Sequence, residues 1–554
     1  MTNVIKRLVL FALLLPYSAV SGETILHNIT GYTSTDAGIH GFGVLVFADD
    51  GKVIATGDQA LLHDYPDAEQ LDGQGRFVLP GLTDAHAHVY GLGFLQVSLD
   101  LQGSPSLDDA VRQIGDYARQ HPQAEWIQGR GWNQVLWPVK AFPTAVDIDA
   151  VVSDRPVWLR RIDGHAGWVN SVALRIAGID KDTPDPVGGK ILRDAQGNAT
   201  GVLIDKAMAL VDAHLPVADK DDIRTAYREA IATMTRLGIT GAHDAGISIG
   251  EAEVYMSMAD DGEIDMRIYA MLSDTGANLD AMGEPLIGYG NDRLDIRSVK
   301  LYSDGALGSR GAAMLEPYAD DVENRGLPFY STDEMYTFVK KANDLGFQVG
   351  VHAIGDRGNR LVLDAFERAQ GGTSSPLRNR VEHAQIIALE DIPRFAELGV
   401  IASMQPVHAT SDMNMAEDRI GPDRIKGGYA WRRLLESGAI IASGSDFPVE
   451  LAEPFHGLYA AVTRQDRAGL PTGGWYADQS LTRAEALHSF TLAAAYAAHQ
   501  ETRLGSLETG KWADFIVVDR DYFEIPAAEI DDIRVLETWV GGQRVYSAGD
   551  GDPE

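Results

Sequence analysis

Residues 78–88 read Val-Leu-Pro-Gly-Leu-Thr-Asp-Ala-His-Ala-His, a short apolar run that ends in two histidines two residues apart. In a β-strand successive side chains alternate between the two faces, so His86 and His88 are expected to point the same way. Two imidazoles at this spacing can bind one metal ion, and imidazole suits zinc well. The pair alone does not establish a site, because about 0.4 His-x-His pairs arise by chance at this histidine content. Whether His86 and His88 bind a metal must be judged from the residues that follow them.

Short apolar runs followed by polar residues recur along the chain and alternate with helix-like segments. This alternation favours a parallel β/α architecture. Eight parallel strands with intervening helices are the count of a (β/α)8 barrel, whose active site lies at the carboxyl ends of the strands. We therefore predict an α/β fold with a TIM-like barrel over residues 81–500. Its expected strands are 82–88, 157–162, 239–243, 298–302, 347–352, 380–383, 400–404 and 439–443.

Two parts of the chain lie outside this pattern. Long intervals separate the first three expected strands, and we expect insertions around residues 100–155 and 165–235 that form a lid over the barrel mouth. Strand-like runs at both ends of the chain predict a composite β-sandwich domain built from residues 23–80 and 501–554. The predicted molecule is thus a barrel flanked by a β domain and a lid.

The first 22 residues have the pattern of a secretory signal peptide. Lys6 and Arg7 supply positive charge, an apolar run begins at Leu8, and small residues around Ser21 offer a cleavage site. The apolar run is shorter than the roughly 20 residues that a membrane span needs. We therefore expect a periplasmic or secreted protein that loses residues 1–22 and has no stable membrane association after cleavage.

The composition excludes several function classes. The chain has 554 residues, of which 45% are hydrophobic and 23% charged, as in an ordinary globular protein of more than one structural unit. Its formal net charge of −33 repels nucleic acid. There is no cysteine, so disulfides, thiolate metal sites and cysteine nucleophiles are excluded. A small molecule is the expected partner, and the sequence also allows a homodimer.

Polar residues that suit a metal centre stand at the ends of the expected barrel strands. Residues at the carboxyl ends of barrel strands converge near one axial point. Four imidazoles, one carboxylate and one amine gathered there would form a ligand set for one or two divalent metals. Any one of them could be structural, but their joint arrival in strand order favours a site. The set consists of His86, His88, Lys300, His352, His383 and Asp446.

The same stretches resemble a known family. Residues 80–88 are similar to the opening motif of the metal-dependent amidohydrolase superfamily, and the later two histidines and the aspartate follow in that superfamily's order. Residues 504–515, Leu-Gly-Ser-Leu-Glu-Thr-Gly-Lys-Trp-Ala-Asp-Phe, are similar to the segment by which its chain returns to the β domain. Four further stretches resemble the branch that contains N-substituted formamide deformylases, namely 163–170, 186–189, 304–310 and 352–356.

The resemblance implies a ligand assignment. His86, His88 and Asp446 would hold a buried metal. His352 and His383 would hold a second, more exposed one. Zinc is the first expectation, although manganese, iron or nickel also accept such donors. Lys300 matches a lysine that many members carboxylate, and its N6-carboxylysine form could bridge two metals. The alternative is an unmodified lysine paired with Asp304 or Asp446. Carboxylation is favoured because a free ammonium beside two metal ions is electrostatically costly.

The resemblance also implies a reaction. Metal-activated hydroxide would attack the carbonyl of an amide-type C–N bond in a non-peptide or N-acyl molecule. Asp446 would accept the proton of the attacking water and pass it to the leaving nitrogen. Hydrolysis of an ester, lactone or cyclic amide at the same centre is the alternative, and a non-catalytic binding protein of the same fold is a third interpretation.

Three residues near the expected site have two interpretations each. His165 could donate a hydrogen bond to the substrate carbonyl or order its own loop. Trp132 could form an apolar wall for the substrate, although a tryptophan in a long insertion is more often core. His243 is expected to support the site or the fold rather than bind metal. A fourth residue, Glu382, should face away from its neighbour His383 on the strand.

Overall fold

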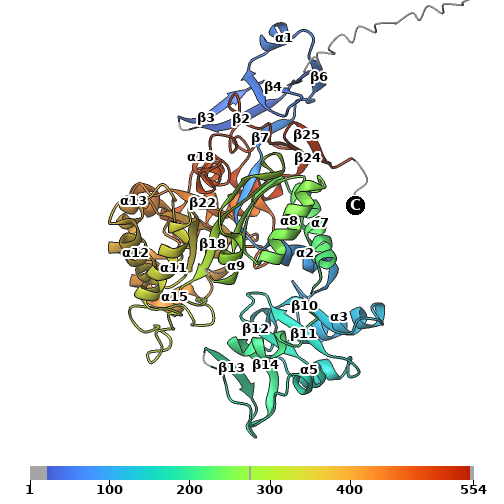
Figure 1. The fold of residues 1–554 in the computed structure, drawn as a ribbon, viewed down its shortest axis with the longest axis vertical. Helices are drawn as coiled ribbons and strands as arrows, with labels where there is room; N and C mark the ends of the chain where they lie inside the picture. The colour runs from blue at the N-terminus through green and yellow to red at the C-terminus, as the bar shows by residue number, and fades with distance from the viewer. Residues whose placement is uncertain (1–21, 36, 187, 217, 274–275, 550–554) are drawn as a thin grey trace, which may run out of the picture.

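A computed structural model describes residues 22–549, except 36, 187, 217 and 274–275. The expected signal peptide lies outside these residues apart from Gly22. Figure 1 shows three parts along the long axis: a β unit that contains both ends of the described chain, a central barrel, and an inserted sheet beyond the barrel. Within the described residues, none of the helices is long and apolar enough to cross a membrane.

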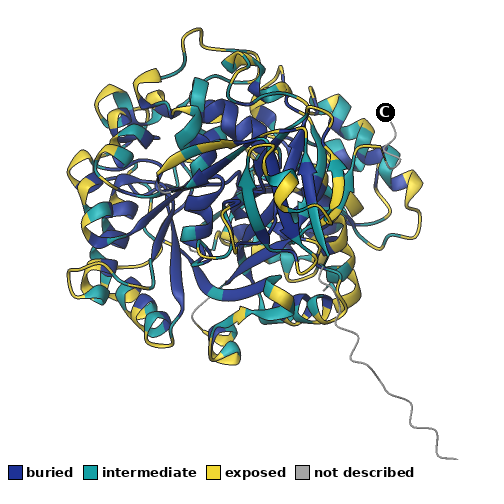
Figure 2. Ribbon diagram, turned by 90° about the horizontal axis from the view of Figure 1, so that it is seen from above, coloured by how far each residue is buried: buried dark blue, intermediate teal, exposed yellow. Residues whose placement is uncertain are grey.

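The central part is the predicted barrel, and the predicted fold class is confirmed. Eight strands follow one another in parallel register around a nearly closed sheet. They form the buried centre of the molecule, with exposed positions on the surrounding helices (Figure 2). In order they are β8 (Leu82–Ala87), β15 (Ile239–Ile247), β16 (Arg267–Leu272), β18 (Leu294–Tyr302), β19 (Gln348–Ala353), β20 (Arg380–His383), β21 (Ile401–Met404) and β22 (Ile441–Ser443).

The barrel closes between its first and last strands through backbone hydrogen bonds that join the end of β8 to the segment after β22. The Asp446 amide donates to the His86 carbonyl at 2.7 Å, and the His88 amide donates to the Phe447 carbonyl at 2.9 Å. We call this junction of residues 86–88 with residues 446–447 the seam. It joins the first histidine pair to the segment that follows the last strand.

One expected strand is wrong and one was missed. The run at 157–162 forms β11 (Val157–Arg161), which belongs to the inserted sheet and not to the barrel. The third barrel strand is β16, whose only charged residue, Arg267, pairs with Asp514 of the terminal β unit at 2.9 Å. Because β11 lies parallel to β10 (Ile127–Trp132) and is buried, its apolar pattern is the same as that of a barrel strand.

The insertion is one continuous sheet within the first β/α unit, not two pieces on either side of a barrel strand. Its strand order is β13-β14-β12-β11-β10-β9, so it covers residues 99–205. The helix α7 (Lys220–Arg236) packs on the barrel helix α2 (Val89–Val97), where any side chain at Gly93 would strike the Ala226 carbonyl. The expected range of 165–235 was therefore too long. The remaining strands are β9 (Leu99–Asp100), β12 (Ala166–Val169), β13 (Gly189–Arg193) and β14 (Ala199–Asp205).

The two ends of the chain share one sheet. β7 (Phe77–Pro80), which leads directly into β8, pairs with β23 (Phe515–Val518) antiparallel and with β2 (Thr30–Thr35) parallel. A second sheet has the order β5-β4-β1-β6. Between the sheets Phe47 packs 5.9 Å from Phe515 by ring centroids. The other strands are β1 (Glu23–His27), β3 (Gly38–Phe42), β4 (Val44–Ala48), β5 (Val53–Gly57), β6 (Glu69–Asp72), β24 (Val535–Val540) and β25 (Gln543–Ser547).

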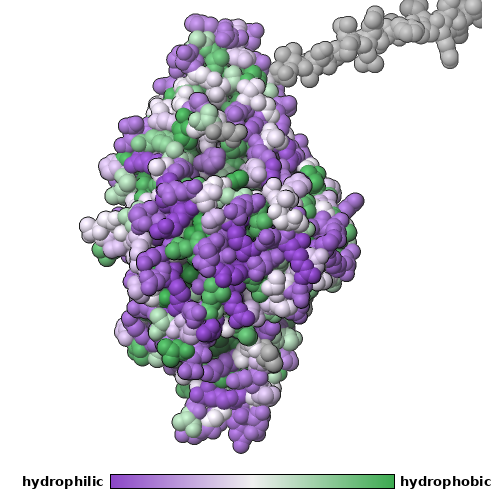
Figure 3. Space-filling model, turned by 90° about the vertical axis from the view of Figure 1, so that its left-hand side faces the viewer, coloured by the Kyte–Doolittle hydropathy of each residue, from purple (hydrophilic) through white to green (hydrophobic). Residues whose placement is uncertain are grey.

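Helices surround the barrel and cover the inserted sheet. The face shown in Figure 3 is largely hydrophilic with scattered apolar groups, as the high net charge leads one to expect. Further helices around the barrel include α8 (Ile249–Asp260), α11 (Thr332–Asp344), α12 (Asp356–Gln370), α13 (Ile392–Leu398), α14 (Pro406–Asp412), α16 (Trp431–Glu436), α17 (Pro454–Thr463), α18 (Arg483–Ser489) and α19 (Leu492–Ala497), and the insertion carries α3 (Leu107–Gln120) and α5 (Ser171–Ile176).

Candidate metal centre

The seam brings three of the predicted ligands together. His86 Nε2 lies 3.6 Å and His88 Nε2 3.2 Å from the same oxygen, Asp446 Oδ1. The ligand atoms of these three residues all lie within 4.8 Å of one another. Two histidines from the first strand and an aspartate after the last strand thus form a compact nitrogen and oxygen donor set, of the kind that zinc and other divalent ions bind.

Buried polar contacts hold this geometry in place. The Asp84 carboxylate accepts a hydrogen bond from the Ser445 hydroxyl at 2.6 Å and from the backbone amides of Ser445 and His86 at 3.1 Å. Gly444 packs so tightly here that a Cβ would strike both Asp84 and the His86 amide. Asp446 itself has a φ of 63°, a left-handed conformation that is strained for a residue with a side chain. The surrounding contacts therefore impose the position of Asp446.

The protonation states suit metal binding. Burial lowers the pKa of His86 to about 4, which leaves its imidazole neutral at pH 7. Burial alone would raise the pKa of Asp446, but the adjacent imidazoles of His88, His86 and His383 hold it well below its ordinary value. A neutral imidazole and an ionised carboxylate are the forms that bind metals.

A buried carboxylate orients His86 from behind. Glu382 Oε2 lies 2.6 Å from His86 Nδ1, so the other ring nitrogen, Nε2, is presented to Asp446. Arg380 donates to both oxygens of Glu382, at 2.8 and 3.0 Å. Burial would raise the pKa of Glu382, but Arg380 and His86 keep it well below its usual range. Both Glu382 and His383 lie against His86, and His383 has a φ of 72°, so simple strand alternation does not describe the end of β20.

Glu382→Gln is expected to weaken the binding of a divalent metal by about 10- to 100-fold, because removing the partner of a ligating histidine typically costs that much affinity. A competition titration against a chromophoric chelator measures the dissociation constant directly. Glu501→Gln, which alters a partly exposed carboxylate paired with Arg378, is the matched control and should leave metal affinity unchanged. Equal affinities of the Glu382→Gln variant and the wild type would contradict this orienting role.

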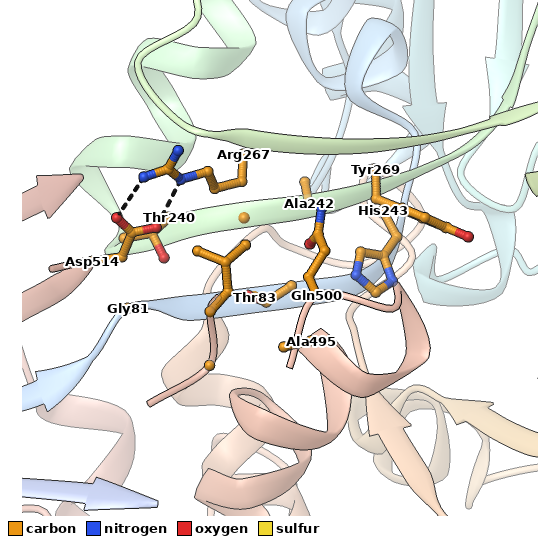
Figure 4. A pocket seen from close by; sticks show the side chains of 13 residues that line it. Gly81, Thr83, Thr240, Ala242, His243, Arg267, Tyr269, Ala495, Gln500 and Asp514 are labelled. Carbon is orange, nitrogen blue, oxygen red and sulfur yellow. Dashed lines mark hydrogen bonds and ion pairs between the residues drawn. The ribbon is translucent and has the colours of Figure 1, made fainter. Parts of the chain in front are cut away.

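His243 lies on the opposite side of Arg380 from the metal centre. Arg380 Nη1 is 2.9 Å from His243 Nδ1, and both side chains are buried. The other face of His243 lines a cavity at the amino-terminal end of the barrel, together with Thr83, Tyr269 and Gln500 (Figure 4). His243 therefore lies outside the metal-ligand groups and contacts the buried network that supports His86.

Lys300 reaches the centre from β18. Its Nζ lies 3.3 Å from His86 Nε2 and 4.6 Å from the ring centroid of Tyr302, and the residue is 1% exposed. It forms no ion pair with either Asp304 or Asp446. The Asp304 carboxylate accepts backbone amides instead, including that of Gly355 at 2.9 Å. The structure thus does not form the ion pairs of the unmodified-lysine alternative.

The structure places His352 and His383 side by side, with ring centroids 4.6 Å apart. His383 belongs to a second group of potential ligands whose donor atoms all lie within 4.8 Å, and its partners there are Asp446 and His408. His408 lies in α14, directly after the seventh barrel strand. Sequence spacing did not predict it, because it lies four residues beyond the end of β21, whereas the other histidines lie within their strands or directly after them.

Buried polar atoms that lack a hydrogen-bond partner indicate whether these residues fit a cation. Among the described residues, the buried atoms without a hydrogen-bond partner include His352 Nε2, His408 Nε2 and Asp446 Oδ1. Leaving such an atom unpaired costs about 1 to 3 kcal/mol. His408 Nε2 and Asp446 Oδ1 belong to residues of the two potential ligand groups, where coordination to a divalent ion would satisfy them, so the residues present fit a metal.

The two predicted substrate contacts lie in the insertion. Trp132 is 0% exposed in the core of the inserted sheet, where its indole donates to the Leu159 carbonyl at 2.8 Å, so it is not at the metal centre. His165 remains partly exposed and its Nδ1 lies 2.8 Å from the Asp205 carboxylate. Its charge helps lower the pKa of His352, after burial and Lys300.

Fold and site together define a class. A parallel β/α barrel with imidazoles and a carboxylate gathered at the carboxyl strand ends is the architecture of metal-dependent hydrolases. The chain belongs to the Amidohydrolase family, whose model matches residues 69–546. The predicted family resemblance is therefore confirmed.

Individual relatives span almost the whole chain. YtcJ of Bacillus subtilis (strain 168) is 33% identical over 513 residues, which cover 90% of this chain and 95% of YtcJ. An N-substituted formamide deformylase of Arthrobacter pascens is 29% identical and covers 87% of this chain and 90% of its own. The structure of an uncharacterized metal-dependent hydrolase from Pyrococcus horikoshii OT3 superposes with a TM-score of 0.76 at 27% identity, covering 91% of this chain and 99% of that one.

Proposed function

We propose that this hydrolase cleaves a C–N bond in a small amide-type molecule, either a non-peptide amide or an N-acyl compound. The observation that carries the proposal is the convergence of His86, His88 and Asp446 at the seam. The similarity to an N-substituted formamide deformylase supports a C–N bond as the target. Zinc is the first candidate metal, since it accepts this donor set.

The residues around such a centre have different roles in the reaction. A divalent ion supplies Lewis acidity, which activates water and polarises a carbonyl. Glu382 and Arg380 hold His86 in one orientation, so the donor set is arranged before substrate binds. Asp446, ionised and fixed by the seam, accepts the proton of the attacking water and delivers it to the leaving nitrogen.

Metal removal tests the proposal. We expect the purified protein to contain at least one zinc or similar ion per chain, and dialysis against a chelator should abolish hydrolysis of a panel of N-formyl and N-acyl amides. Zinc should restore activity, and melting temperature should rise because a ligand that binds only the folded state stabilises it. Well under one ion per chain, with a melting temperature indifferent to chelation, would contradict a metal-dependent hydrolase.

We also propose that Lys300 carries a carboxylated side chain. Burial of an unpaired ammonium beside His86 is costly, whereas a carbamate supplies anionic oxygens to the centre. Lys300→Ala should therefore lose most activity, and short carboxylic acids should restore part of it. The exposed Lys190→Ala serves as the control and should behave like the wild type with and without added acid. Unchanged activity of Lys300→Ala would favour the plain lysine.

We further propose that the protein is exported, on the basis of the signal-like residues 1–22. Amino-terminal sequencing of the protein from periplasm or medium would test this. A mature chain that begins near residue 23 is the expected result, and retention of Met1 in the cytoplasm would contradict it.

A further inference from the structure

We propose that His408 is a metal ligand, so that His383, His408 and Asp446 form a second cation site that shares Asp446 with the first. This inference rests on the proposed metal-dependent function and extends it to the seventh barrel strand. It differs from the expectation drawn from the family resemblance, in which His352 and His383 hold the second ion without a residue from this strand.

The two oxygens of Asp446 face the two groups. Oδ1 lies 3.6 Å from His86 Nε2 and 3.2 Å from His88 Nε2, whereas Oδ2 lies 3.8 Å from His408 Nε2. A carboxylate directed in this way can bind one ion through each oxygen. Asp446 therefore is placed to bridge two neighbouring cations.

The rings of His383 and His408 are arranged to approach one point. Their planes are inclined by only 24°, with centroids 5.8 Å apart. His383 Nδ1 is 2.8 Å from Gln405 Oε1, so Nε2 is the nitrogen left to bind metal. His408 Nε2 is buried and has no hydrogen-bond partner among the described residues. A buried imidazole nitrogen without a hydrogen-bond partner is costly unless it binds a ligand.

Helix α14 holds His408 firmly. Its residue Asp412 accepts hydrogen bonds from the Tyr429 hydroxyl at 2.7 Å and from Gln385 Nε2 at 3.0 Å. The Ser411 hydroxyl donates to Glu450 at 2.6 Å. Side chains on both sides of the helix thus fix its position, as a metal site requires of the elements that carry its ligands.

The test counts ions in the whole protein. Wild type, His408→Ala and the exposed His214→Ala control are equilibrated with chelator-buffered zinc, and bound zinc is measured by mass spectrometry. Wild type and control should bind two ions per chain. His408→Ala should keep the ion of the first site and bind the ion of the second site more than about 100-fold more weakly. Removing a metal ligand should cost more affinity than the roughly 10- to 100-fold that removing the partner of a ligand costs. Equal melting temperatures of the metal-free proteins would exclude misfolding.

The outcomes separate this inference from the proposed function. If wild type binds one or two ions and His408→Ala binds as many with unchanged affinity, the second site is overturned while metal dependence stands. If the wild type binds only one ion and His408→Ala binds none, the proposal of two separate sites is likewise overturned. If wild type binds no zinc, manganese or cobalt, both proposals fail. Cobalt absorption of His408→Ala against wild type gives an independent readout, because removing a nitrogen ligand changes the visible spectrum.

Discussion

Asp446→Asn is expected to lower kcat/KM by about 10²- to 10⁴-fold, the range that a positioned general acid–base group contributes. Asparagine keeps the size of the side chain and the backbone hydrogen bond to His86, but it cannot accept a proton from water. Steady-state kinetics on the metal-loaded protein measure the loss, and metal content is determined in parallel. The first site should retain much of its metal, because both histidines and one amide oxygen remain.

A matched aspartate separates chemistry from folding. Asp531 lies 3.0 Å from His456 away from the metal centre, so Asp531→Asn also weakens a largely buried Asp–His contact. It should reduce activity only slightly. If Asp446→Asn turned over substrate near the wild-type rate while still holding metal, the proton-transfer role assigned to Asp446 would be wrong.

Arg380→Met is expected to reduce the free energy of unfolding by about 3 to 5 kcal/mol, the usual cost of removing one partner of a buried ion pair. The reason is that Glu382 would stay buried against His86 without its guanidinium, and the Ala85 carbonyl and Ser403 hydroxyl would lose a donor as well. Chemical denaturation of the metal-free protein measures the change without a contribution from bound ions.

Two comparison variants make this result interpretable. Arg368→Met removes an exposed arginine that pairs with Asp333, and it should cost less than about 1 kcal/mol. The double variant Arg380→Met/Glu382→Gln removes both buried charges and should recover part of the lost stability. Similar destabilisation by Arg380→Met and Arg368→Met would show that the buried network contributes little.

The barrel could be predicted well from the sequence because its strands combine apolar runs with catalytic residue types at their ends. His86, His88, His383 and Asp446 could be assigned to one site from their order along the chain, since residues at the ends of successive barrel strands share a common axial point. The same criterion failed for β16, which ends without a titratable residue and so gave no functional signal.

Other parts of the site depend on contacts between distant segments. Strand alternation did not predict that Glu382 contacts His86, because His86 lies on another strand and only the closed barrel brings the two side chains to 2.6 Å. His408 follows a strand that was correctly predicted, yet no spacing rule links it to Asp446. The sequence could not distinguish whether Trp132 lines the substrate pocket or packs in the core of the insertion, because both places favour apolar residues. Its complete burial places it in the core.

The seam has a consequence for when this protein can first become active. The histidine pair lies near the amino terminus and is synthesised early, whereas Asp446 follows the last barrel strand. A partly synthesised or partly translocated polypeptide therefore has no assembled centre. Catalytic competence must therefore appear late and all at once, when the eighth strand docks against the first. Gain of activity during refolding would accordingly report barrel closure itself, and truncation before residue 446 should give chains that capture metal weakly and never turn over substrate.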